Sequence, residues 1–167
     1  MKYWITTDWH LNHANIIVYE ARPTNYMELI MKRHLEKIKP DDVLINLGDV
    51  IFARRKELKE FMEKIPARKK ILVRGNHDEP NTDTFYYEHG FDFVCDSMII
   101  DYIQFSHAPM QLSDDILCNV HGHYHANGHR SEEPWYINYN RHLLLALETE
   151  NYYPVSLDVI KERIKRM

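Results

Sequence analysis

Short apolar runs alternate with segments of helical periodicity in the first half of the chain, and further apolar runs follow in the second half. The runs are rich in Ile, Val, Leu and aromatic residues, which is typical of strands buried in a sheet. They predict strands at Lys2–Thr7, Val43–Leu47, Lys70–Val73, Met98–Ile100, Tyr102–Phe105, Ile116–Val120 and Leu143–Leu147.

Other segments carry apolar residues at helical spacing. In the clearest of them, apolar residues recur at i, i+3, i+4, i+8 and i+11 over Met27–Ile38, and Thr24 is placed to cap the start of this helix. The same pattern predicts helices over residues 58–65 and Asn81–Tyr87. Ser156 is placed to cap a final helix close to the end of the chain.

The elements start in the order strand, helix, strand, helix, strand, and then turn to hairpin-like strands around Asp101 and Asn138–Arg141. This order predicts an α/β protein with one mixed sheet, or with two sheets packed together, between helices. The sequence has no Gly/Ser linker, low-complexity tract or internal repeat. We therefore expect a single domain over residues 1–167.

Composition narrows the classes of partner. The chain has 21 Lys and Arg against 25 Asp and Glu, a formal net charge of −4 at pH 7. A protein that holds long nucleic acid by counterion release needs a basic face, so that role is disfavoured, whereas a short nucleotide stays open as a ligand. The sequence lacks an apolar run of the roughly 18 to 20 residues that a membrane span needs, and it lacks a signal-peptide pattern. We expect a cytoplasmic protein without membrane contact.

Eleven histidines are the most informative feature of the composition. Many of them lie in five polar clusters that each follow an apolar run: Asp8-Trp9-His10, Gly48-Asp49, Gly75-Asn76-His77-Asp78, Ser106-His107 and His121-Gly122-His123-Tyr124-His125. Because ligands bind at the carboxyl ends of strands in open α/β folds, the five clusters are expected to converge in one crevice. Carboxylate and imidazole ligands without thiolate suit Mn, Fe, Zn or Ni. Their number exceeds the ligand shell of one ion, so two metal ions fit better.

In their order and spacing, these clusters resemble the motifs of the calcineurin-like metallophosphoesterases: D-x-H, G-D, G-N-H-D/E, a lone H and G-H-x-H. The opening segment Thr7–Ile17 further resembles a compact, single-domain subgroup found in bacteria and phages. The resemblance implies a four-layer α/β/β/α sandwich of two mixed sheets flanked by helices. It also implies an enzyme that hydrolyses phosphate esters with two divalent metal ions.

The resemblance also implies the ligands of the two ions. One ion would be held by Asp8, His10, Asp49 and His125. The other would be held by Asn76, His107, His123 and the shared Asp49. Two ions roughly 3.5 to 4 Å apart lower the pKa of a bridging water and clamp the phosphate oxygens. The resulting bridging hydroxide would attack phosphorus directly, so no covalent nucleophile of the protein is needed.

The remaining candidates surround the implied ligands. By resemblance, His77 would donate a proton to the leaving oxygen and Asp78 would orient its imidazole; the alternative for His77 is a loop histidine without a catalytic role. Arg74 either binds a substrate phosphate or pairs with a surface carboxylate. His13 either contacts the substrate or has a role outside the reaction.

The leading hypothesis is therefore a phosphoesterase that acts on a small phosphodiester or phosphomonoester. One alternative is a nuclease on longer nucleic acid, which the net charge disfavours. Another is a catalytically weak binding or scaffold protein on the same fold, which the intact His77 and the seven intact ligand positions disfavour. The substrate, the native metal and the oligomeric state stay open, because specificity lies in loops around such a site rather than in its metal motifs.

Overall fold

The computed structural model describes residues 1–52, 56–127 and 133–167, and these form two mixed sheets. The first sheet has the strand order β4-β3-β2-β1-β9, with β1 at Tyr3–Thr6, β2 at Val43–Asn46, β3 at Lys69–Val73, β4 at Phe93–Cys95 and β9 at Val155–Ser156. The second sheet has the order β5-β6-β7-β8, with β5 at Ser97–Ile100, β6 at Ile103–Ser106, β7 at Cys118–His121 and β8 at His142–Leu144.

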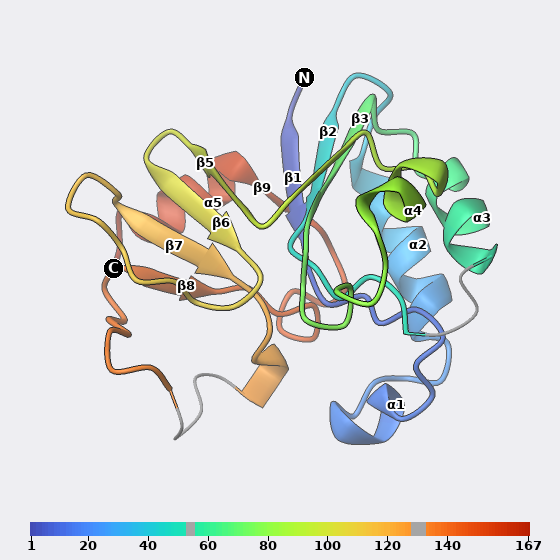
Figure 1. The fold of residues 1–167 in the computed structure, drawn as a ribbon, viewed down its shortest axis with the longest axis horizontal. Coiled ribbons are helices and arrows are strands. Elements are labelled where there is room, and N and C mark those ends of the chain that lie inside the picture. Colours follow the sequence, from blue (N-terminus) through green and yellow to red (C-terminus); the bar gives the residue numbers. More distant parts are fainter. Residues whose placement is uncertain (53–55, 128–132) are drawn as a thin grey trace.

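Most neighbouring strands in both sheets are parallel. In the first sheet β1 to β4 are parallel and β9 runs antiparallel to β1. In the second sheet β5 and β6 form the antiparallel hairpin expected around Asp101, whereas β6, β7 and β8 are parallel. Figure 1 shows the parallel strands of both sheets running toward the same region, between the two sheets. The loops after these strands therefore meet there.

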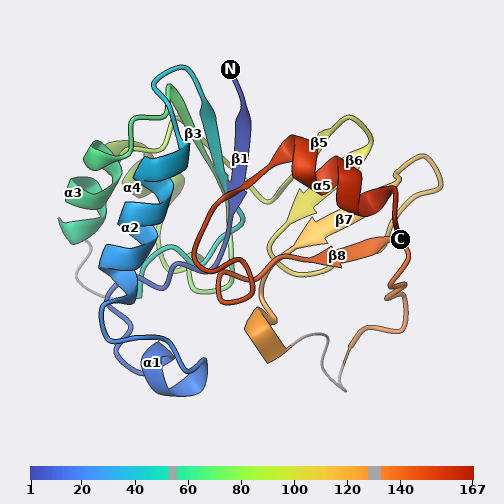
Figure 2. The same cartoon turned by 180° about the vertical axis from the view of Figure 1, so that it is seen from behind.

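Helices flank the two sheets. They are α1 at Ile16–Tyr19, α2 at Tyr26–Lys37, α3 at Lys56–Lys64, α4 at Asp83–Glu88 and α5 at Leu157–Ile164, with a 3₁₀ turn at His125–Asn127. Helices α2, α3 and α4 lie on the outer side of the first sheet, and α5 lies beside the second sheet (Figures 1 and 2). This arrangement confirms the predicted α/β fold of two mixed sheets flanked by helices. None of the described helices is long and apolar enough to cross a bilayer.

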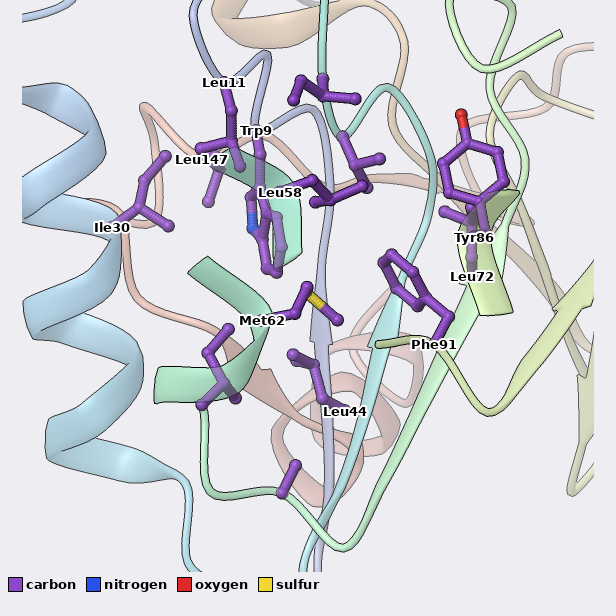
Figure 3. Close-up of a cluster of buried hydrophobic side chains, with 14 of the residues drawn as sticks. Trp9, Leu11, Ile30, Leu44, Leu58, Met62, Leu72, Tyr86, Phe91 and Leu147 are labelled. Carbon is purple, nitrogen blue, oxygen red and sulfur yellow. The ribbon is translucent and has the colours of Figure 1, made fainter. Parts of the chain in front are cut away.

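Two hydrophobic clusters hold the layers together. One lies between the first sheet and its helices, where Trp9 and Met62 are completely buried and pack with Leu44 and Leu58 (Figure 3). The second joins the facing sides of the two sheets, with residues such as Ile45 of β2 and Phe105 of β6 fully buried. Burial on this scale is the main force that fixes the strand ends relative to one another.

Some element boundaries differ from the sequence predictions. The predicted cap at Thr24 is wrong, because α2 starts one residue later with Asn25 as N-cap, and no side chain caps it by a hydrogen bond. Ser156 caps α5 as predicted, with its hydroxyl accepting from Val159 N at 3.4 Å. The expected hairpin around Asn138–Arg141 is also wrong, since β8 pairs parallel with β7. A parallel pair needs a long crossover rather than a tight turn.

Candidate metal centre

The predicted ligands Asp8, His10 and His125 lie together at the ends of β1 and β7. His10 Nε2 is 3.8 Å from Asp8 Oδ1, and His125 Nε2 is 3.7 Å from the same oxygen. His10 Nε2 is also 3.5 Å from Asp49 Oδ2, at the end of β2. All four side chains are buried. The four residues expected to hold the first ion thus form one group of possible ligands.

A second group adjoins the first through Asp49. His107 Nε2 lies 3.4 Å from Asp49 Oδ2, 3.0 Å from Asn76 Oδ1 and 3.1 Å from His123 Nδ1. These are the residues expected to hold the second ion. The structure therefore brings all seven predicted ligands together, with one oxygen of Asp49 facing both groups.

The backbone is turned sharply at many of these positions. Asp8, His10, Asp49, His123 and His125 have φ angles of 49°, 48°, 54°, 70° and 49°. Non-glycine residues seldom adopt positive φ, and such conformations cluster at functional sites where the surrounding fold enforces them. Part of the folding free energy is therefore used to direct these side chains toward one point.

Glycines make room for the same loops, in two different ways. Gly48 has a φ of 99°, a conformation that glycine adopts without steric cost. Gly75 and Gly122 do not have positive φ. Instead, a Cβ on Gly75 would collide with the Asp49 carboxylate, and a Cβ on Gly122 would collide with Thr7 and Asp8. These two glycines are needed for close approach of neighbouring loops.

Several buried polar atoms in this cluster of possible ligands have no hydrogen-bond partner among the described residues, which indicates whether the cluster fits a metal ion. Asp8 Oδ1 and both ring nitrogens of His10 lack a hydrogen-bond partner among the described residues, although all three atoms are buried. A buried polar atom without a partner costs free energy, so native proteins rarely leave three in one cluster. Carboxylate oxygens and imidazole nitrogens are good ligands for divalent transition metals. The residues present therefore fit such ions.

The charges of the two buried carboxylates point the same way. Burial, together with the Asp8 carboxylate and against the opposing effect of His107, raises the pKa of Asp49 to about 6. For Asp8, burial also opposes ionisation, but the adjacent ring of His10 and the other nearby histidines outweigh it, so its pKa lies well below the usual range. Two ionised carboxylates are unfavourable together in this dry site. A bound cation would remove that penalty.

Metal affinity is expected to fall steeply below about pH 6. Asp49 must lose its proton to bind an ion, and its raised pKa means that it takes up that proton at a higher pH than an ordinary carboxyl group does. His125 adds to the effect: burial lowers its pKa, but Glu148 and Asp8 outweigh burial and raise it, so the ring is also protonated on acidification. Competition titration with Zn²⁺ or Mn²⁺ should show about a tenfold loss per pH unit for each proton displaced. Constant affinity from pH 7.5 to 5 would contradict the prediction.

Two further residues, the buried Arg22 and the partly buried Glu148, support the ligand loops, and neither was predicted from the sequence. The completely buried side chain of Arg22 donates through Nη1 to Trp9 O at 2.9 Å and through Nη2 to Asp8 O at 2.8 Å. Its Nε donates to Glu148 Oε1 at 2.8 Å, and the same oxygen lies 3.4 Å from His125 Nδ1. Glu148 follows an apolar run, as the recognised clusters do, and could have been found by that pattern. Arg22 has no comparable pattern.

Glu148→Gln is expected to weaken metal binding by about 10-fold to 100-fold, because a carboxylate behind a ligand imidazole fixes the orientation and basicity of the ring. The variant keeps the shape of the side chain but removes the charge that faces His125 and Arg22. Competition titration measures the affinity. Glu150→Gln is the matched control, since Glu150 lies nearby in sequence but pairs with Arg163. Equal affinities of Glu148→Gln and the unaltered protein would refute this role.

His77 lies at the exposed rim of the ligand group. Its side chain is 40% exposed, and Nε2 is 3.9 Å from Asp49 Oδ2. Its ring centroid is 5.3 Å from that of His10. His77, His10 and Asp49 also offer ligand atoms that all lie within 4.8 Å of one another. The position is accessible to a substrate.

Asp78 does not have the contacts expected of a residue that orients His77. Its buried carboxylate accepts from the backbone amides of Asp49 at 2.7 Å, Gly75 at 2.9 Å and Val50 at 3.2 Å, and from the Tyr86 hydroxyl at 3.0 Å. These bonds join the loop after β2 to the loop after β3. Asp78 therefore holds the two ligand loops together, and the orientation of His77 by Asp78 stays a prediction.

Arg74 pairs with surface carboxylates, which was the second of its two predicted alternatives. Its guanidinium pairs with Asp96 at 2.7 Å and with Asp83 at 3.1 Å. The side chain still lines a cleft of about 600 Å³ together with Asn76 and His107. A contact with substrate phosphate stays a prediction for this residue.

His13 lies beside His10 and His77 at the edge of the ligand group. Its ring centroid is 5.5 Å from that of His10, and its ring stacks on Phe52 with centroids 4.1 Å apart and an interplanar angle of 13°. Its predicted contact with substrate is compatible with this place beside the site. No local pattern in the sequence marks Phe52 as the partner of His13.

Comparisons with known proteins agree with this geometry. Residues 1–158 match the family model described as calcineurin-like phosphoesterase. An uncharacterized protein of Methanocaldococcus jannaschii is 32% identical over 172 residues, covering 99% of this chain and 92% of that protein. A protein of unknown function from Aquifex aeolicus has a similar structure, with a TM-score of 0.74, 25% identity and coverage of 96% and 98% of the two chains. A nuclease from Pseudomonas putida shares the fold with a TM-score of 0.54 at 19% identity, over 74% of this chain and 60% of that chain. The chain belongs to the calcineurin-like phosphoesterase family.

Proposed function

We propose that this protein is a phosphoester hydrolase that uses two divalent metal ions and acts on small phosphodiesters or phosphomonoesters. The observation that carries the proposal is the position of Asp49, whose Oδ2 lies 3.5 Å from His10 Nε2 and 3.4 Å from His107 Nε2. One carboxylate oxygen that faces two groups of ligands is placed to serve as a ligand shared by a pair of ions. Membership of the calcineurin-like phosphoesterase family supports the class of reaction.

The ligands divide between the ions as the two groups of side chains do. Asp8, His10 and His125 would hold one ion, Asn76, His107 and His123 the other, and Asp49 both. When bound, such ions supply positive charge that makes water a better nucleophile and stabilises the negative charge that develops on phosphate. Mn, Fe, Zn and Ni all suit these ligands.

The residues of the protein then bind and orient the ester. The cleft of about 600 Å³ beside Asn76, His107 and His123 accommodates one substituent of the phosphate. His77, on the exposed rim of the group, faces the other substituent and donates a proton to the oxygen that leaves with it. A proton on the departing oxygen prevents build-up of an alkoxide charge, so the slow bond cleavage becomes easier. Arg22 and Asp78 keep the ligand loops fixed during this step.

Hydrolysis of a substrate panel tests the proposal. The purified protein is stripped of metal, reloaded separately with Mn²⁺, Fe²⁺, Zn²⁺ or Ni²⁺, and mixed with a phosphomonoester, a linear phosphodiester, and 2′,3′- and 3′,5′-cyclic nucleotides. We expect metal-dependent release of product from at least one ester, with no release from the stripped protein. Inactivity on every ester with every metal, at confirmed metal occupancy, would rule the proposal out.

A nuclease is the second candidate, because the structurally similar protein of Pseudomonas putida is a nuclease. The net charge of −4 disfavours tight binding of long nucleic acid. A single-stranded and a double-stranded oligonucleotide belong in the same panel for this reason. Cleavage of an oligonucleotide without turnover of any small ester would favour the nuclease.

A further inference from the structure

Exposed aromatic side chains lie beside the ligand group, on the flank that carries His77. Phe52 is 55% exposed and Tyr19, at the end of α1, is 66% exposed. The ring of His13 lies between them, stacked on Phe52 at 4.1 Å and edge-on to Tyr19 at 6.2 Å between centroids. We call Phe52, His13 and Tyr19 the aromatic rim. Single exposed aromatic residues are common on protein surfaces, but here three rings adjoin a cluster of ligand-type residues.

The rim is joined directly to the proposed proton donor. The ring of Phe52 meets the ring of His77 edge-on, with centroids 5.8 Å apart and an interplanar angle of 67°. His13 lies 6.4 Å from His77 by the same measure. A group attached to the oxygen that His77 protonates therefore lies close to the rings of Phe52 and His13.

The backbone holds Phe52 in this place. Its amide donates to Leu11 O at 3.1 Å, and the preceding residue Ile51 forms a parallel bridge with Leu11. Leu11 in turn follows the ligand His10. Phe52 is thus fixed to the loop that carries part of the ligand group, which is what a binding surface for substrate needs.

We infer that the aromatic rim binds a planar nucleobase, so that the leaving group of the preferred ester is a nucleoside. This inference rests on the proposed function, because it uses His77 to locate the leaving group. Stacking on aromatic and histidine side chains is how proteins bind unpaired bases, and it tolerates any base because each has a flat face. An aliphatic alcohol has no such face. The nucleoside could belong to a small diester or to the end of a single strand, since both present the same chemistry.

The test compares a dinucleoside monophosphate with a diester whose leaving group is glycerol. Phe52→Ala is expected to lower kcat/KM for the dinucleoside ester by roughly 10-fold to 100-fold, because the variant loses the stacking of one base. The kcat/KM for the glycerol ester should fall by less than about twofold. Phe52→Trp should retain activity on the dinucleoside ester. Phe93→Ala is the matched control, since Phe93 is 51% exposed but lies on the edge strand β4. Equal losses on both esters, or no loss on either, would overturn the inference.

A second arm measures binding without turnover. Calorimetry compares adenosine 5′-monophosphate with ribose 5-phosphate, which carries a hydroxyl group in place of the base, on the unaltered protein and on Phe52→Ala. We expect the base to increase affinity about tenfold or more, and Phe52→Ala to remove that gain. If no ester is hydrolysed, this arm still decides the inference: a gain that depends on Phe52 supports it, and equal affinities overturn it. An oligonucleotide cleaved at its terminus, with the dinucleoside ester inert, would assign the nucleoside to a strand end.

Discussion

Asp49→Ala is expected to abolish hydrolysis and to weaken the binding of both metal ions at once. Asp49 Oδ2 faces both groups of ligands, so its loss removes a ligand from each. Metal ions bound in such a site typically contribute several kcal/mol to the stabilisation of the transition state. Since each 1.36 kcal/mol corresponds to a factor of ten, we expect a loss of roughly 10³-fold or more in kcat/KM. Steady-state kinetics and metal analysis of the same preparation measure the two effects.

Other ligand variants provide the controls for Asp49→Ala. His10→Ala and Asn76→Ala each remove a ligand from one group only, and should therefore chiefly weaken one ion. In Asp49→Asn, the side-chain amide oxygen can still accept the hydrogen bond that His77 N donates to Asp49 Oδ1 at 2.9 Å. Retention of two tightly bound ions in Asp49→Ala would disprove the shared-ligand assignment.

The stability of the metal-free variants shows whether a lost activity reflects a lost fold. Because burial and the Asp8 carboxylate raise the pKa of Asp49, its ionised form makes an unfavourable contribution to the metal-free folded state near neutral pH. The metal-free Asp49→Asn protein should thus unfold at a temperature no lower than the metal-free unaltered protein does. Thermal unfolding after removal of metal checks this expectation.

The sequence was sufficient to predict which residues gather at the site, because five motifs each follow a strand and parallel strands end at the same edge. Asp8, Asp49 and His107 illustrate this. They follow β1, β2 and β6, yet each offers a possible ligand atom that lies within 4.8 Å of those of the other two. The seven strands predicted from apolar runs are also present, with boundaries that differ by a few residues. Strong periodicity and motif spacing carry this kind of information.

Contacts between distant segments could not be predicted in the same way. Arg22 and Glu148 are 126 positions apart, and nothing local marks them as partners. The carboxylate of Asp78 was assigned to its neighbour His77, but the fold brings the loop of Asp49 and Val50 closer to it. The short strands β4 and β9 were missed because Phe93–Cys95 and Val155–Ser156 are too brief to show alternation. Each of these features depends on tertiary packing rather than on local pattern.

His77→Asn is expected to lower turnover by about 10² to 10⁴ for esters with a poor leaving group, the usual contribution of a general acid. Activated aryl esters leave readily without protonation, so the same variant should slow them much less. His77 is 40% exposed, so its replacement should leave the fold and both bound ions intact. Kinetics on a matched pair of alkyl and nitrophenyl diesters, with metal analysis of each preparation, measure these effects.

Because His77 lies beside His10 and Asp49, the alternative role for it is that of a metal ligand, and the His77→Asn variant distinguishes the two roles. A residue that ligates an ion would, when replaced, lose metal and slow both kinds of ester alike, because metal-dependent charge stabilisation serves every leaving group. A proton donor would retain the metal and lose activity in proportion to the basicity of the departing oxygen. His89→Asn is the matched control, since the ring of His89 contacts Phe85 O at 2.7 Å on α4, in a different part of the fold. Selective loss on the alkyl ester at full metal occupancy therefore identifies His77 as the acid, whereas parallel loss with reduced occupancy identifies it as a ligand.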